Sequence, residues 1–168
     1  MSATANPQLA MRPFLPAETP LAAEIFRESI EELTVDEYSE DQRSAWASAA
    51  DDEEAFGARL AGQLTLLGTL GGAPVGFASL KGTDEIDMLY VHPAATRRGV
   101  GTMLLDALEK LAASRGAGRL VAEVSDSAQE FFRHRGYVAQ RRNSLPIGGE
   151  WLVNTTMEKK LASKGTPR

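Results

Sequence analysis

A short segment in the middle of the chain combines arginines and glycines in the order Arg97-Arg98-Gly99-Val100-Gly101-Thr102. Glycine allows close approach to the backbone and conformations that other residues avoid. At the start of a helix, unpaired backbone amides and the helix dipole attract an anion. The segment therefore predicts a phosphate cradle formed by the amides of residues 98–102. The competing interpretation is a tight strand-to-helix turn whose glycines serve packing alone.

Two carboxylates, Glu85 and Asp87, precede this segment on an expected strand over residues 85–91. Side chains two residues apart on a strand point to the same face of a sheet. A carboxylate held in such a place can act as a general base. The alternative for each residue is an ordinary solvated position on a strand.

Composition excludes several other kinds of chemistry. The chain contains no cysteine, so it has no thiolate nucleophile, no thiolate metal site and no disulfide. A formal net charge of -5 argues against nucleic acid as the main partner. The segment after residue 97 has neither the Gly-Lys-Ser/Thr ending of an ATPase loop nor the full Gly-x-Gly-x-x-Gly dinucleotide fingerprint.

Around these residues, the pattern predicts a helical opening followed by strands. Apolar spacing and capping signals favour helices that begin after Thr19, taken as an N-cap, and after Ser39, which starts a capping box with Gln42. A third helix is expected over residues 52–60, a long one over 101–114 and another over 126–135. Strands are expected over 9–15, 63–70, 73–81, 85–91, 120–124, 137–145 and 150–161. The predicted class is α/β with a mixed sheet.

A length of 168 residues predicts a single domain. Its ordered core is expected over residues 8–161, with frayed segments before residue 8 and from Ala162 onward. No apolar run is long enough to span a bilayer, and no leader segment is visible, so we expect a cytoplasmic protein without a membrane partner.

The segment from His92 to Gly101 resembles the acyl-CoA signature of the GNAT superfamily of N-acetyltransferases, Gln/Arg-x-x-Gly-x-Gly/Ala. Residues 128–137, Ala-Gln-Glu-Phe-Phe-Arg-His-Arg-Gly-Tyr, are similar to the later Ala-x-x-Phe-Tyr-x-x-x-Gly-Phe segment of that superfamily. The end of the chain, residues 157–161, resembles its last strand. The resemblance covers about residues 11–161. It implies a mostly antiparallel sheet of six or seven strands with about four helices, splayed between the fourth and fifth strands.

The resemblance implies acetyl-CoA as co-substrate, no metal and direct attack by a primary amine in a ternary complex. The implied cofactor-binding residues are Leu89, Tyr90, Val91, Arg97, Arg98, Gly99, Val100, Gly101, Thr102, Ser125, Phe131 and Phe132. Glu85 or Asp87 is the implied base, with a water chain as the alternative, and Arg133 is a further candidate for the phosphates of CoA. Tyr38 and Trp46 are implied to line the acceptor pocket, although core packing is the alternative for Trp46.

Two positions depart from the superfamily pattern. Thr96 stands where Gln or Arg is usual, which removes one polar anchor and leaves the backbone amides. Phe132 stands where many members have a tyrosine that protonates the departing thiolate, and phenylalanine cannot donate that proton. The remaining candidates for the acid are Tyr137, Ser125 and Ser127, or solvent. Each of these side chains could equally have a structural role.

The predicted function is N-acetyl transfer to a small-molecule amine. A non-catalytic acyl-CoA-binding or partner-binding module and an acetyltransferase of protein N-termini or lysines are the alternatives, and a homodimer is left open. Ten acids against one base between residues 31 and 54 suggest a field that attracts a dicationic acceptor. These acids are Glu31, Glu32, Asp36, Glu37, Glu40, Asp41, Asp51, Asp52, Glu53 and Glu54. The alternative is an ordinary solvated face.

Overall fold

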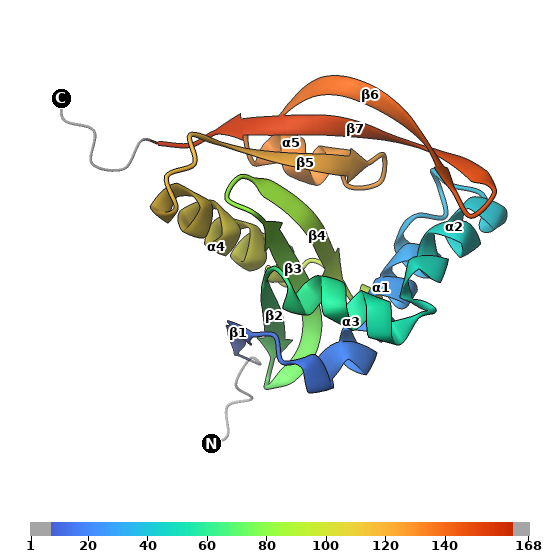
Figure 1. Ribbon diagram of the computed structural model, residues 1–168, viewed down its shortest axis with the longest axis horizontal. Coiled ribbons are helices and arrows are strands. Elements are labelled where there is room, and N and C mark those ends of the chain that lie inside the picture. Colours follow the sequence, from blue (N-terminus) through green and yellow to red (C-terminus); the bar gives the residue numbers. More distant parts are fainter. Residues whose placement is uncertain (1–7, 163–168) are drawn as a thin grey trace, which may run out of the picture.

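The computed structural model describes residues 8–162 as a seven-stranded sheet with helices on both faces (Figure 1). The strands are β1 (Leu9–Pro13), β2 (Leu64–Leu70), β3 (Ala73–Lys81), β4 (Glu85–Val91), β5 (Arg119–Ser125), β6 (Val138–Ile147) and β7 (Glu150–Lys160). The α-helices are α1 (Thr19–Leu33), α2 (Glu40–Ala47), α3 (Glu53–Ala61), α4 (Val100–Ser114) and α5 (Gln129–His134). The expected class is confirmed, and the five α-helices correspond to the five that the sequence pattern predicts.

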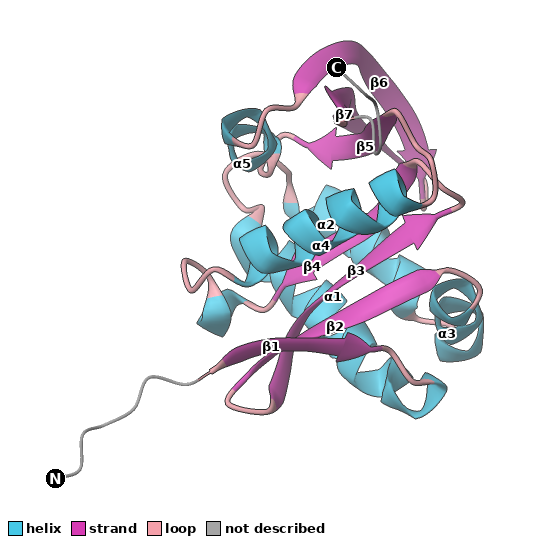
Figure 2. Cartoon of the chain, turned by 90° about the vertical axis from the view of Figure 1, so that its left-hand side faces the viewer, coloured by secondary structure: helices cyan, strands magenta, loops and turns pink. Residues whose placement is uncertain are grey.

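The strand order is β1-β2-β3-β4-β5-β7-β6, and all neighbours are antiparallel except β4 and β5. The parallel pair of β4 and β5 is short, because only Glu85 with Val121 and Ile86 with Ala122 are in register. Beyond these two pairs the strands diverge, as the resemblance implied. In Figure 2, β5, β6 and β7 lie together at one end of the molecule beside α5.

A bulge in β4 changes which side chains face which helices. Ser79 of β3 lies opposite Met88 and Leu80 lies opposite Ile86, so Asp87 is an extra residue without a partner on β3. In a regular strand, Ile86 and Met88 would face the same side. Here Ile86 packs in the cluster that contains α4, whereas Met88 packs in the cluster that contains α1.

The core therefore has two parts, one on each face of the sheet. The α4 face buries Leu104, Leu105 and Leu108 against β3, β4 and β5, and the α1 face buries Phe26 and Ile30 together with residues of α3. Glycines in β2 and β3 let α4 approach closely. A Cβ atom built on Gly76 would lie 2.9 Å from Cγ1 of Val100, so a side chain there would push the start of α4 away.

The capping prediction holds for α2 and is wrong for α1. Ser39 Oγ accepts a hydrogen bond from the Gln42 amide at 3.1 Å, and the Gln42 side chain accepts one from the Ser39 amide at 2.9 Å. Thr19 is the first residue of α1, and Glu18 holds the N-cap position. A 3-10 turn over Pro16–Glu18 leads directly into this helix, and the Thr19 hydroxyl donates to the Pro16 carbonyl at 2.7 Å.

The expected fraying of residues 1–7 and of the tail from Ala162 falls almost entirely outside the described residues. Among residues 8–162, no helix combines the length and apolar character that crossing a membrane requires. The same range contains no group of three or more His, Asp or Glu side chains that could hold a metal ion.

Candidate active site

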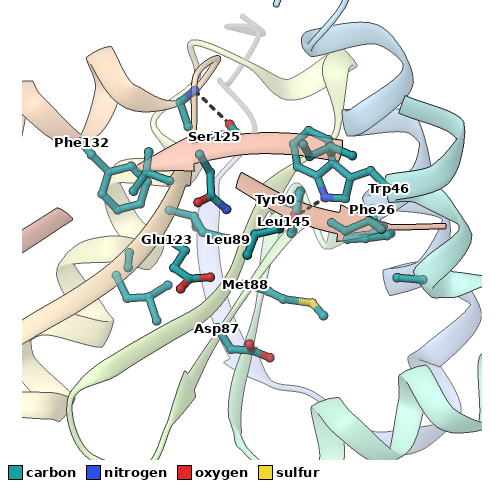
Figure 3. A pocket seen from close by; sticks show the side chains of 18 of the residues that line it. Phe26, Trp46, Asp87, Met88, Leu89, Tyr90, Glu123, Ser125, Phe132 and Leu145 are labelled. Atoms are coloured by element: carbon teal, nitrogen blue, oxygen red, sulfur yellow. Dashed lines mark hydrogen bonds between the residues drawn. The ribbon is translucent and has the colours of Figure 1, made fainter. Parts of the chain in front are cut away.

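A cavity of about 280 Å³ opens where β4 and β5 diverge (Figure 3). Its walls include Ile86, Leu89, Ala122, Val124, Ala128 and Phe132, which belong to or pack against the core on the α4 face. They also include Phe26, Trp46, Met88 and Tyr90 from the core on the α1 face. The cavity therefore borders both faces of the sheet. Two ligands that approach from opposite faces could meet in it.

The predicted cradle lies at the start of α4, beside the end of β4. Gly99 is the N-cap residue with φ 88°, and Arg97 has φ 62°, so this turn uses left-handed backbone at two positions. Such a conformation is easy for glycine and strained for arginine. The amides of the first turn of α4 have no carbonyl partner within the helix, which leaves them free to bind an anion.

The residues expected around the cofactor gather at this end of the sheet. A Cβ atom built on Gly101 would lie 3.4 Å from Cζ of Phe131 and 3.8 Å from Cγ2 of Val91, so the first turn of α4, α5 and the end of β4 meet here. Thr102 follows in the same turn of α4. Leu89, Tyr90, Ser125 and Phe132 line the cavity itself.

The arginines near the cradle differ in their surroundings. Arg97 and Arg98 are exposed, and their side chains form no hydrogen bond or ion pair with residues 8–162. Arg133 instead contacts Glu130 at 3.2 Å and the side chain of Gln129 at 3.2 Å on its own helix. Arg97 and Arg98 are thus free to meet a phosphate group, whereas Arg133 already has partners.

The two candidate bases have different environments. Asp87 receives two hydrogen bonds from Arg59 of α3, at 2.8 and 2.9 Å, and a third from Gln63 at 2.9 Å. Partial burial would raise the pKa of Asp87, but the hydrogen bonds and the charge of Arg59 outweigh it and lower that pKa. Asp87 is therefore a poor proton acceptor. Glu85 lines the same cavity, and its carboxylate has no such partner among the described residues.

A third carboxylate in the cavity wall, Glu123 of β5, was not predicted. Leu120, Ala122 and Val124 are buried in the core on the α4 face, so Glu123 lies on the opposite face of β5. That alternation is readable in the sequence. The sequence does not show that β5 diverges from β4 and leaves Glu123 at the edge of a cavity.

Tyr137 lies elsewhere than its predicted role requires. It is 1% exposed, it is not among the cavity-lining residues, and its hydroxyl donates to Glu109 Oε2 of α4 at 2.8 Å. Lys159 binds the other oxygen of Glu109 at 3.0 Å. Burial and the Glu109 carboxylate both raise the pKa of Tyr137. The structure thus corrects the assignment of Tyr137 as the acid, because its hydroxyl is held by a network outside the cavity.

Tyr38 and Trp46 both line the cavity, as predicted for the acceptor side. The Tyr38 hydroxyl donates to the Val153 carbonyl at 2.7 Å and accepts from the Asp126 amide at 2.9 Å. Trp46 Nε1 donates to the Tyr90 hydroxyl at 3.2 Å, and burial raises the pKa of Tyr90 to about 12. Burial likewise raises the pKa of Tyr38. This aromatic wall joins α2 to β4 and β7.

The acidic residues between positions 31 and 54 do not line the cavity. All ten are exposed. The carboxylates in the cavity wall come from β4 and β5 instead, and Arg59 neutralises the one on Asp87. Exposed charges are screened by salt over about 8 Å, so the helical acids give little support to a preference for dicationic acceptors.

Known proteins share this fold. Residues 34–161 match the model of the acetyltransferase (GNAT) domain family. The chain is 30% identical over 152 residues to YafP, an uncharacterized N-acetyltransferase of Escherichia coli (strain K12), covering 90% of this chain and 96% of YafP. The crystal structure of a GCN5-related N-acetyltransferase from Rhodopseudomonas palustris has a TM-score of 0.90 and 61% identity, covering 96% of this chain and 99% of that one.

More distant structures share the fold. The PaiA N-acetyltransferase of Thermoplasma acidophilum, solved in complex with coenzyme A, has a TM-score of 0.76 at 20% identity and covers 91% of this chain and 99% of its own. The chain belongs to the GNAT family. It is an acyl-CoA-dependent N-acetyltransferase.

Proposed function

We propose that this enzyme transfers the acetyl group of acetyl-CoA to a primary amine of a small molecule, by direct attack in a ternary complex. The cavity between β4 and β5 carries this proposal, because its walls come from both faces of the sheet. The thioester enters beside α4 and α5, and the amine enters beside α1 and α2. Holding both reactants in one cavity replaces a bimolecular encounter by an oriented one.

The start of α4 is the proposed site for the pyrophosphate of acetyl-CoA. The amides of residues 98–102 bind the phosphate oxygens, and Arg97 and Arg98 supply positive charge. Beyond Ile86, β4 has no registered partner on β5, so backbone groups between Asp87 and Val91 are free to bind pantetheine. An amide near Leu89 or Tyr90 is the proposed donor to the oxyanion. PaiA, which shares the fold, was solved in complex with coenzyme A, and this supports coenzyme A as the ligand.

Glu85 is the proposed general base. It lies on β4 in the cavity wall, and its carboxylate is not engaged by another described side chain. A neutral amine must form before it can attack, and the proton that leaves its nitrogen goes to Glu85 or to a water that Glu85 holds. The ion pair with Arg59 makes Asp87 a structural support for the bulge in β4.

The size and walls of the cavity favour a small acceptor. Its volume of about 280 Å³ lies near the lower end of small-molecule sites. Phe26, Tyr38 and Trp46 close the acceptor side. Aromatic faces attract an ammonium group and pack against an aliphatic chain.

The test measures release of the CoA thiol from acetyl-CoA in the presence of a panel of small primary amines, peptides with free N-termini and peptides with an internal lysine. We expect thiol release that saturates with at least one small amine and the appearance of its N-acetyl product by mass spectrometry. Background hydrolysis without amine is the control. Turnover with peptides alone would contradict the small-molecule acceptor.

A further inference from the structure

Phe132 leaves the departing sulfur of CoA without the usual hydroxyl partner on α5. The side chain is 5% exposed and packs edge-on against Tyr137, with ring centroids 5.1 Å apart. The centroid of the Phe131 ring lies 5.5 Å from that of Phe132. The only hydroxyl in this cluster, on Tyr137, is bound to Glu109. Within the described chain, α5 thus presents no hydroxyl to the cavity.

Three hydroxyl-bearing side chains line the cavity: Tyr38, Tyr90 and Ser125. The proton of Tyr38 is already donated to the Val153 carbonyl. Tyr90 packs with Phe26 and Phe77 on the α1 face, which is the acceptor side. Ser125 is the one at the start of α5, where the thioester is proposed to enter.

The geometry of Ser125 suits a hydrogen-bond donor. Its Oγ accepts a hydrogen bond from the Ala128 amide at 3.2 Å (Figure 3). The two residues belong to the turn that precedes α5. Ala128 and Phe132 line the same cavity. The Ser125 proton has no acceptor among residues 8–162, so it remains available to a ligand. An oxygen that already accepts a hydrogen bond is polarised toward donating its own proton.

We propose that the Ser125 hydroxyl donates a hydrogen bond to the sulfur of CoA as the thioester breaks, and thereby replaces the tyrosine that Phe132 has displaced. This assignment rests on the proposed transfer from acetyl-CoA. The amine nitrogen forms a bond to the carbonyl carbon, and the carbon–sulfur bond breaks with its electron pair going to sulfur. Glu85 takes one proton from the ammonium group before the attack, and the second nitrogen proton leaves to solvent after the new bond has formed. The thiolate keeps the hydrogen bond from Ser125 until solvent protonates it, because an aliphatic hydroxyl is a weaker acid than a thiol.

The first test is turnover of Ser125→Ala with Ser127→Ala as a matched control. Ser127 belongs to the same turn, but its hydroxyl donates to Glu37 at 2.6 Å and it does not line the cavity. A hydrogen bond to a charged group corresponds to about a tenfold to hundredfold effect, so kcat of Ser125→Ala should fall by that factor. Ser127→Ala should stay within about twofold. Ser125→Thr keeps the hydroxyl and should recover most of kcat.

The second test separates a hydrogen bond to sulfur from loss of the hydrogen bond between Ser125 and Ala128 in the turn before α5. Thiolate absorbance of bound CoA, followed against pH in the binary complex, reports the pKa of the thiol. A donor at Ser125 stabilises the thiolate, so this pKa should rise by about one unit in Ser125→Ala and stay unchanged in Ser127→Ala.

A fall in kcat without a change in the thiol pKa would overturn the proposal, because it would show that Ser125 only supports the turn before α5. Unchanged kcat in Ser125→Ala would overturn it as well. Failure of wild-type protein to bind CoA would instead contradict the proposed function, so the two failures are distinguishable.

Discussion

The two sides of the cavity are built in different ways. On the side proposed for the cofactor, the six consecutive residues 97–102 beside the cavity form the proposed cradle, and the backbone would supply the donors. On the acceptor side, Phe26, Tyr38, Trp46 and Val153 come from separate parts of the chain, and most of the wall consists of side chains. A backbone site depends on one local conformation. A side-chain site depends on how distant elements pack.

This difference predicts how each side responds to substitution. A change in the cradle should abolish cofactor binding, because no other group can replace the amides of a helix start. A change in the acceptor wall should alter affinity by smaller steps, because the remaining aromatic groups still fill the space. Side-specific variants should therefore separate acetyl-CoA binding from amine binding.

The largest effect is expected for Gly101→Glu. The new side chain would meet Phe131 and Val91, and its charge would oppose the phosphates. Acetyl-CoA at 100 times its Kd should stabilise wild-type protein by about 2.7 kcal/mol, which appears as a rise in Tm. The variant should show no such rise. Gly118→Glu is the control, because a Cβ atom there meets nothing within 4 Å. If the folded Gly101→Glu variant shows the same rise in Tm with acetyl-CoA as wild type, the cofactor binds elsewhere.

Glu85→Gln should lower kcat at least tenfold, since a positioned base typically contributes about 100-fold or more. The thermal shift with acetyl-CoA should not change, because Glu85 acts after binding. Steady-state kinetics and thermal unfolding with acetyl-CoA give the two measurements, and a wild-type kcat would rule out Glu85 as the base.

Asp87→Asn should affect stability through the ion pair at the bulge. We expect a loss of about 1 kcal/mol in the free energy of unfolding at neutral pH, a modest value because the Arg59 side chain is 47% exposed. The pKa of Asp87 is lowered in the folded state, so its contribution is present above the unfolded pKa of about 3.9 and is lost as the pH falls through the folded pKa.

Urea unfolding at several pH values tests this prediction, with Asp84→Asn as the control. The side chain of Asp84 forms no ion pair with the described residues. The difference between wild type and Asp87→Asn should shrink toward low pH. A difference that grows with acidity would contradict the sign of the pKa shift.

The smallest effect is expected for Trp46→Leu. Loss of the indole ring should raise KM for the amine by about fivefold. The rise in Tm with acetyl-CoA should not change. Trp151→Leu is a matched control, because that tryptophan is 62% exposed on β7 and does not line the cavity. Equal KM values for both variants would remove Trp46 from the acceptor wall.

Local features of the molecule could be read from the sequence. The cradle, the capping box at Ser39 and the strands on either side of the Gly71-Gly72 turn follow from neighbouring residues. The two family motifs also lie next to each other, since the first turn of α4 approaches Phe131 and the neighbouring Phe132 lines the cavity.

Features that depend on tertiary packing could not be read in this way. Asp87 and Arg59 are 28 residues apart, and nothing in either segment indicates their pairing. The bulge at Asp87 breaks the strict alternation on which strand predictions rest. Tyr137 is near Phe132 in sequence, but its hydroxyl donates to Glu109 of α4. Thr19 was assigned as a cap because the 3-10 turn before it was not foreseen.

The order of substrate binding tests the central claim most directly. If both substrates meet in the cavity between β4 and β5, initial rates measured over a grid of acetyl-CoA and amine concentrations should give intersecting double-reciprocal lines, as a ternary complex requires. Parallel lines would indicate an acetylated enzyme intermediate. That result would contradict direct attack and with it the role proposed for the two-faced cavity.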